Sequence, residues 1–171
     1  MIAKIVNGML LWIVRRSVFI SLNLVTLVFT IYCLKGMWGF IHFLSDMNQE
    51  EIDGMNEILD GIAGIFVAIG VLMEERETIL KISGATLKPN DGYLNEVAHH
   101  NGMGLLLIGL FMELISLMIE SPKNIVNTSG IEKYLYMLGF AVIFFAALIK
   151  IDFIKDYVKT YFKTPEQKKS H

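Results

Sequence analysis

The residues best suited to chemistry lie in two short stretches near the middle of the chain. One stretch is acidic and the other carries neighbouring histidines, and a turn-rich segment from Gly84 to Gly92 joins them. Because that connection is short, we expect the two helices that carry these stretches to be neighbours. Carboxylate and imidazole groups together bind Zn²⁺, Fe²⁺ or Mn²⁺. We therefore predict one divalent metal ion with ligands drawn from Glu74, Glu77, Glu96, His99 and His100.

The spacing of Glu96 and His99 supports that hypothesis but does not complete a larger site. This E-x-x-H step resembles the one that di-iron carboxylate bundles use, but a two-metal site needs a second such step, and the other histidines are His42 and His171. Haem is not expected. Bis-histidine ligation needs two histidines at the same depth on facing helices, whereas His42 lies at one end of the predicted bundle and His99 and His100 lie at the other. The alternative is a solvated belt at the helix ends, in which Arg76 and Lys81 pair with the glutamates.

Two further acids interrupt otherwise apolar segments. Asp60 lies in the run from Ile58 to Met73, and Glu113 lies in the run from Met103 to Ile119. A carboxylate at membrane depth is costly, so it is expected to be protonated, paired or turned toward a wet cavity. Glu113 shares a helical face with His99, Gly102, Leu106 and Gly109, and we expect this face to point inward. Asp60 lies near the small pair Gly64 and Ala68. We predict an ion or proton path through Asp60 and Glu113, with a purely structural packing role as the alternative.

The elements that must position these residues are four long apolar segments. We predict an all-α fold, an integral membrane four-helix bundle, since about 20 apolar residues at 1.5 Å per residue cross the hydrocarbon core. The expected spans are residues 17–44, 55–82, 94–120 and 131–155, which together form a bundle over 17–155. Residues 1–16 are expected to form an interfacial N-terminal helix, and 156–171 a basic cytoplasmic tail that continues an amphipathic C-terminal extension.

The distribution of cations predicts the orientation of the bundle. Of the fifteen lysines and arginines, twelve flank the N-terminus, the connection between the second and third spans, or the C-terminus; the other three are Lys35, Lys123 and Lys133. Cationic flanks stay on the cytoplasmic side. We therefore predict a multi-pass protein of the cell membrane with both termini in the cytoplasm.

Composition and motifs narrow the function without identifying a reaction. The formal charge of −2 gives no reason to expect nucleic acid as a partner, and the single cysteine, Cys33, excludes an intrachain disulfide. No phosphate-binding loop, nucleophile elbow or dinucleotide motif is present in the sequence. The leading expectation is a membrane subunit without its own catalysis, which contacts lipids and either self-associates or joins a larger complex. The alternative is a membrane protein that handles a metal, protons or ions through the residues named above.

Overall fold

The computed structural model describes residues 2–41, 49–85, 91–120 and 131–162. Every regular element within these ranges is a helix, which confirms the predicted all-α class. The helices are α1 (Ile2–Ile13), α2 (Arg16–Ile41), α3 (Gln49–Glu74), α4 (Arg76–Ile82), α5 (Asp91–Glu120) and α6 (Glu132–Phe162).

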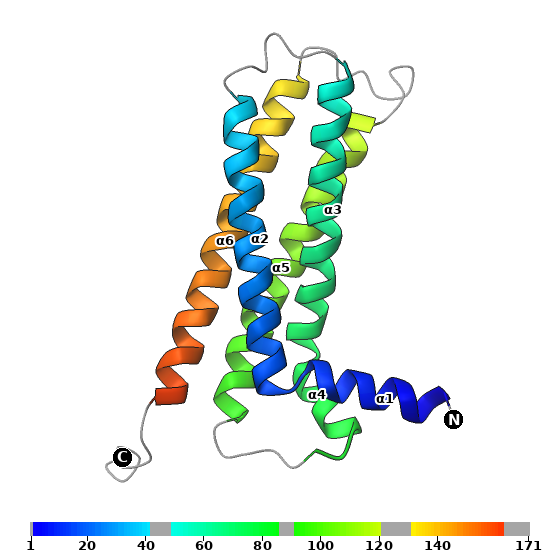
Figure 1. Ribbon diagram of the computed structural model, residues 1–171, viewed down its shortest axis with the longest axis vertical. Helices are drawn as coiled ribbons and strands as arrows, with labels where there is room; N and C mark the ends of the chain where they lie inside the picture. Colours follow the sequence, from blue (N-terminus) through cyan, green and yellow to red (C-terminus); the bar gives the residue numbers. More distant parts are fainter. Residues whose placement is uncertain (1, 42–48, 86–90, 121–130, 163–171) are drawn as a thin grey trace.

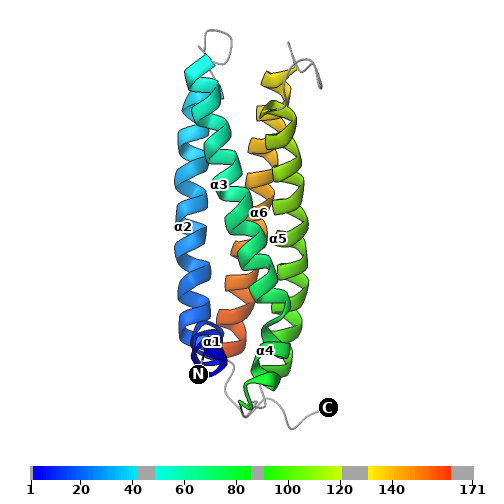
Figure 2. The same cartoon turned by 90° about the vertical axis from the view of Figure 1, so that its right-hand side faces the viewer.

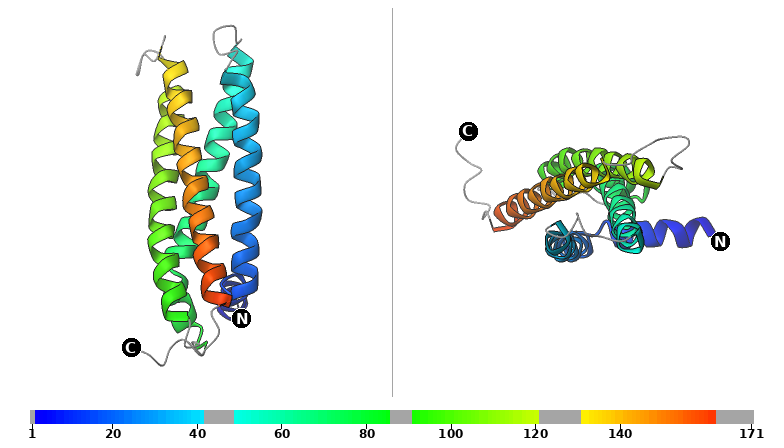
Figure 3. Two further views of the ribbon diagram at one scale, coloured as in Figure 1. Left: turned by 90° about the vertical axis from the view of Figure 1, so that its left-hand side faces the viewer. Right: turned by 90° about the horizontal axis from the view of Figure 1, so that it is seen from above.

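The four long helices α2, α3, α5 and α6 run side by side with alternating direction (Figures 1 and 2). At one end of the bundle α1 leaves the helix axes at a steep angle, and α4 and the last turns of α6 lie at that same end (Figure 1). We call it the α4 end and the opposite one the distal end. Seen from above, α2 stands to one side of the other three helices, and α1 projects outward (Figure 3).

These four helices are long and apolar enough to cross a membrane, which suggests a multi-pass membrane protein. The shortest of the four candidate spans, Asp53–Glu74, has 22 residues and thus reaches about 33 Å, more than the roughly 30 Å of a bilayer core. Large apolar side chains cover the outside, whereas several polar ones are buried inside. A water-soluble bundle does not expose large apolar side chains over so much of its outer surface.

Two helix boundaries differ from the predicted ones. The expected span 55–82 is divided at Glu75, whose backbone (φ −87°, ψ 5°) departs from the regular helix, and α4 continues in a new direction with Arg76 buried. The sequence EERETILKI contains no glycine or proline from which that break could be predicted. Gly84, with φ +67°, ends α4 in a left-handed conformation that glycine adopts without strain. The second difference is the end of the last helix: the predicted span is 131–155, whereas α6 continues without a break from Glu132 to Phe162. The rest of the predicted tail, residues 163–171, lies outside the described residues.

Candidate functional site

The interface between α3 and α5 is the closest helix contact in the bundle, and glycines make it possible. A Cβ atom on Gly102 would lie 2.6 Å from the backbone nitrogen of Glu74, and one on Gly70 would lie 2.6 Å from that of Leu106. Gly109 packs in the same way against Ala63 and Val67. The predicted packing face of the third span, with Gly102 and Gly109, therefore does point inward. These contacts also fix the antiparallel register of the two helices.

At the α4 end, this register brings together two of the five predicted metal ligands. The Nδ1 atom of His99 lies 3.8 Å from Oε1 of Glu74, and both side chains are partly exposed. Glu77 instead forms an ion pair with Lys81, at 2.6 Å. His100 Nδ1 lies 3.1 Å from the backbone oxygen of Glu96, on an exposed surface.

The described part of the chain contains no group of three or more His, Cys, Asp or Glu side chains that could hold a metal ion. The metal site over Glu74, Glu77, Glu96, His99 and His100 thus stays a prediction, with the approach of Glu74 to His99 as its structural basis.

The two predicted intramembrane acids lie at one level of the α3–α5 pair. Asp60 precedes Glu74 by fourteen residues, and Glu113 follows His99 by fourteen. Fourteen residues are two heptads, an interval after which packed helices repeat their facing positions. The register that pairs Glu74 with His99 therefore sets Asp60 at the level of Glu113, about 21 Å nearer the distal end. Asp60 is exposed and Glu113 is half-buried.

A lysine that sequence reasoning assigned to the cytoplasmic flank is buried inside the bundle. Lys150 of α6 is 0% exposed, and its Nζ donates a hydrogen bond of 2.8 Å to Oγ1 of Thr26 on α2. The ammonium also lies 5.7 Å from the ring centroid of Phe66 on α3. A buried cation held by a hydroxyl and an aromatic face ties three helices together at one level.

The polar wall that receives Lys150 follows one face of α2. Asn23, Thr26 and Thr30 are buried at three- and four-residue spacing. Each turns a donor onto the helix's own backbone: Asn23 Nδ2 to Phe19 O, Thr26 Oγ1 to Asn23 O, and Thr30 Oγ1 to Thr26 O. This leaves oxygen acceptors facing the bundle interior. The three- and four-residue spacing of these polar residues is visible in the sequence and could have predicted their common buried face. Lys150 could have been found in the same way, because it lies at three- and four-residue spacing from the buried residues Ile143, Ala146 and Phe153.

Arg76 is the second buried cation, with 2% of its surface exposed. Its Nη1 donates to Oδ1 of Asn95 on α5, and its guanidinium lies 5.4 Å from the ring centroid of Phe19 on α2. Phe19 in turn meets Phe153 of α6 edge to face, with ring centroids 5.9 Å apart. Arg76 therefore anchors the start of α4 to the bundle, which accounts for the change of direction after Glu75.

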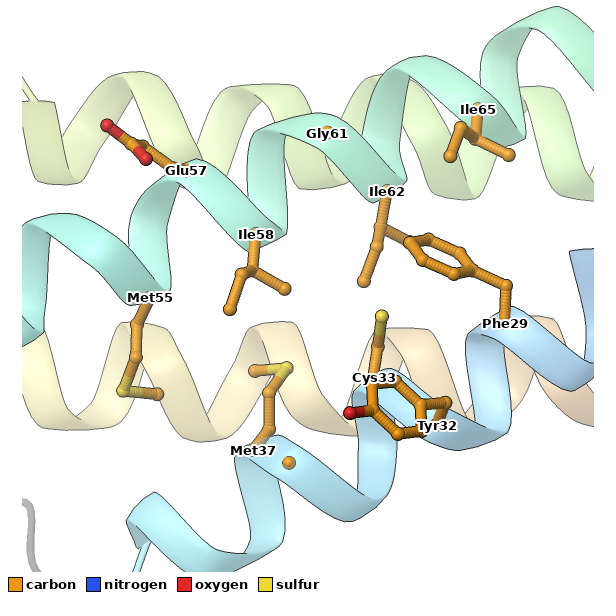
Figure 4. A pocket seen from close by; sticks show the side chains of 11 residues that line it. Phe29, Tyr32, Cys33, Met37, Met55, Glu57, Ile58, Gly61, Ile62 and Ile65 are labelled. Atoms are coloured by element: carbon orange, nitrogen blue, oxygen red, sulfur yellow. The ribbon is translucent and has the colours of Figure 1, made fainter.

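A groove opens between α2 and α3 toward the distal end, where these two helices barely touch (Figure 4). Its volume is about 370 Å³, and its walls are mostly apolar. Cys33 and Met37 of α2 face Met55, Ile58 and Ile62 of α3 across the gap (Figure 4). Gly36 and Gly61 line it as well, and neither has an atom within 4 Å of its Cβ position.

The outward side of α3 carries small residues that nothing in the described part of the chain covers. Gly61, Gly64 and Ala68 are exposed, and no atom lies within 4 Å of a Cβ position on either glycine. Gly70 of the same helix is buried against α5. The helix thus has two faces of small residues, one packed inside the bundle and one open, and Gly61 connects the open face to the groove.

No known protein family, no curated protein and no solved structure matches this chain.

Proposed function

We propose that this chain is a multi-pass protein of the cell membrane, with both termini in the cytoplasm, that serves as a non-catalytic subunit and binds a partner through α3. The partner is a second copy or another membrane protein, and membrane lipids cover the remaining apolar surface. The observation that carries the proposal is the open small-residue face of Gly61, Gly64 and Ala68. Small residues let transmembrane helices approach closely, and α3 already uses them in this way against α5.

The proposed topology agrees with the arrangement of the helices. Both α1, at the start of the chain, and the last turns of α6 lie at the α4 end (Figure 1). The cations Arg15, Arg16 and Lys155 belong to this end. An excess of cations marks the cytoplasmic side, so we assign the α4 end to the cytoplasm.

Site-specific photo-crosslinking in membranes tests the partner site. A photoreactive amino acid at Ala68 is expected to give a defined adduct, whereas the same amino acid at Leu148, an exposed apolar position of α6, is expected to give none. The mass of the adduct distinguishes a second copy from another protein. Absence of a protein adduct from both Gly64 and Ala68 would refute the proposed interface.

The second candidate function is the handling of a metal, protons or ions, and one observation favours it. The α3–α5 register brings His99 Nδ1 within 3.8 Å of Glu74 and puts Asp60 and Glu113 at one level of the same helix pair. Elemental analysis of the purified protein tests the first pair, with a His99→Ala/His100→Ala variant beside the wild type. Flux into liposomes, compared between wild type and Glu113→Gln, tests the second. Metal-free wild type and unchanged flux would together remove this function.

A further inference from the structure

The first helix, α1, lies across the end of the bundle instead of along it. It leaves the α4 end at a steep angle to the long helices and projects outward (Figures 1 and 3). Its main contacts are with the adjoining parts of α2 and α4. At 12 residues it is about 18 Å long, too short for a hydrocarbon core of roughly 30 Å. In a membrane that the four long helices cross, α1 therefore runs along the surface.

One face of α1 is apolar and exposed. Val6, Met9 and Trp12 follow one another at three-residue spacing, and they are 46%, 60% and 60% exposed. Ile2 and Ile5 occupy positions on the same helical face. A surface helix of this kind buries its apolar face at the boundary between lipid headgroups and acyl chains. Tryptophan is enriched at that depth.

The charge of this part of the chain is entirely positive. The first 34 residues contain Lys4, Arg15 and Arg16 but no aspartate or glutamate. Arg15 is exposed, and within the described ranges its guanidinium forms neither an ion pair nor a hydrogen bond. On the neighbouring helix α4, Glu77 is already paired with Lys81 at 2.6 Å. An uncompensated cation at a membrane surface attracts anionic lipid headgroups.

Arg15 stands at the corner where α1 meets α2. Only Val14 and Arg15 separate the two helices. Val14 is 0% exposed, its backbone nitrogen donates to the oxygen of Leu10 at 3.0 Å, and the nitrogen of Arg15 donates to the oxygen of Trp12 at 3.3 Å. Packing and hydrogen bonds thus hold the corner. Because it joins a surface helix to a spanning helix, the corner lies at the level of the lipid headgroups.

We infer that α1 and the corner at Arg15 form a binding surface for anionic phospholipid. Val6, Met9 and Trp12 contact the acyl chains, and Arg15 contacts the phosphate group of the lipid. The complementary charge selects an acidic phospholipid over a zwitterionic one. The inference adds a lipid class and its contact residues to the proposed function. It rests on that function for the membrane alone and is independent of any protein partner at α3.

Tryptophan quenching by brominated lipids tests the surface in the full chain. The chain has two tryptophans, and a Trp38→Phe background leaves Trp12 as the reporter while it retains an aromatic ring beside Phe140. The protein is reconstituted into vesicles of phosphatidylcholine and phosphatidylglycerol in which only one of the two lipids carries bromine in its acyl chains. Both lipids are expected to quench Trp12, and phosphatidylglycerol is expected to quench it more at equal mole fraction. High salt is expected to reduce this preference.

One substitution tests the role of the corner cation. Arg15→Gln is expected to lower the preference for phosphatidylglycerol by up to about fivefold, the factor that one cation contributes at an anionic membrane surface. Lys35→Gln is the matched control, because Lys35 is an exposed cation of α2 that lies 20 residues, or about 30 Å, further along the chain. It is expected to leave the preference at Trp12 unchanged. Helix content shows that each variant folds.

Three results would overturn the inference: no quenching of Trp12 by either lipid, equal quenching by both, or an Arg15→Gln variant with the preference of the wild type. Crosslinking at Ala68 reports on the partner site separately. A protein adduct at Ala68 without lipid preference at Trp12 keeps the subunit function and removes the lipid surface. Lipid preference without an adduct keeps the lipid surface and removes the partner site.

Discussion

Replacement of Gly102 by alanine is the most direct test of the α3–α5 interface. The new Cβ would lie 2.6 Å from the backbone nitrogen of Glu74 and 2.8 Å from the carbonyl oxygen of Gly70, and ordinary contact begins at 3.4 Å. The two helices must therefore separate locally by about 0.8 Å, since backbone atoms cannot rotate away as a side chain can. Forced overpacking of this kind costs about 1–3 kcal/mol.

Gly64→Ala is the matched control. It makes the same chemical change in α3, the partner helix of α5, but causes no clash. No atom lies within 4 Å of the Cβ position on Gly64. Alanine in a helix is favoured over glycine by about 1 kcal/mol, so this variant is expected to be as stable as the wild type or more so. The helix preference favours alanine at both positions and cancels, so the expected difference in the free energy of unfolding between the two variants is the cost of the clash alone, about 1–3 kcal/mol.

Equilibrium unfolding in mixed detergent micelles, followed by circular dichroism, measures that difference. Gly109→Ala is expected to behave like Gly102→Ala, because its Cβ would meet the backbone nitrogen of Val67 at 2.8 Å. If Gly102→Ala unfolded at the same detergent composition as Gly64→Ala, the close approach of α3 and α5, and with it the register that sets Asp60 level with Glu113, would be wrong.

Three further predictions concern the buried cations and the topology. Thr26→Val is expected to destabilise the protein by about 1.5–3 kcal/mol, because Lys150 loses its hydroxyl acceptor, whereas Thr26→Ser keeps that acceptor; equal unfolding free energies for the two variants would contradict the contact. Arg76→Lys is expected to cost about 1 kcal/mol or more, since an ammonium does not reproduce the planar contact with the Phe19 ring, and the loss is expected to shrink in a Phe19→Leu background. In a Cys33→Ser background, a cysteine at Ser83 is expected to react with an impermeant thiol reagent only after cell lysis, and one at Asp53 in intact cells; the reverse pattern would invert the proposed topology.

The sequence predicts the four long helices well because a long apolar run is a strong local signal, and it predicts the inward face of α5 because glycine spacing reports close packing. It does not distinguish the two small-residue faces of α3. Gly64 and Gly70 are alike in the sequence, yet only Gly70 is covered by another helix. Which face is covered depends on the position of α5, and that is a tertiary property that no local pattern contains.

The burial of two charged residues is likewise not predictable from the sequence. Arg76 and Lys150 stand at the ends of apolar segments, where flanking cations normally meet water and phosphate groups, and the rule that identifies the cytoplasmic side counts both. Their burial follows from partners on other helices: Asn95 and Phe19 for Arg76, Thr26 and Phe66 for Lys150. The break at Glu75 cannot be predicted from the sequence either, because it depends on the burial of Arg76 and involves no glycine or proline.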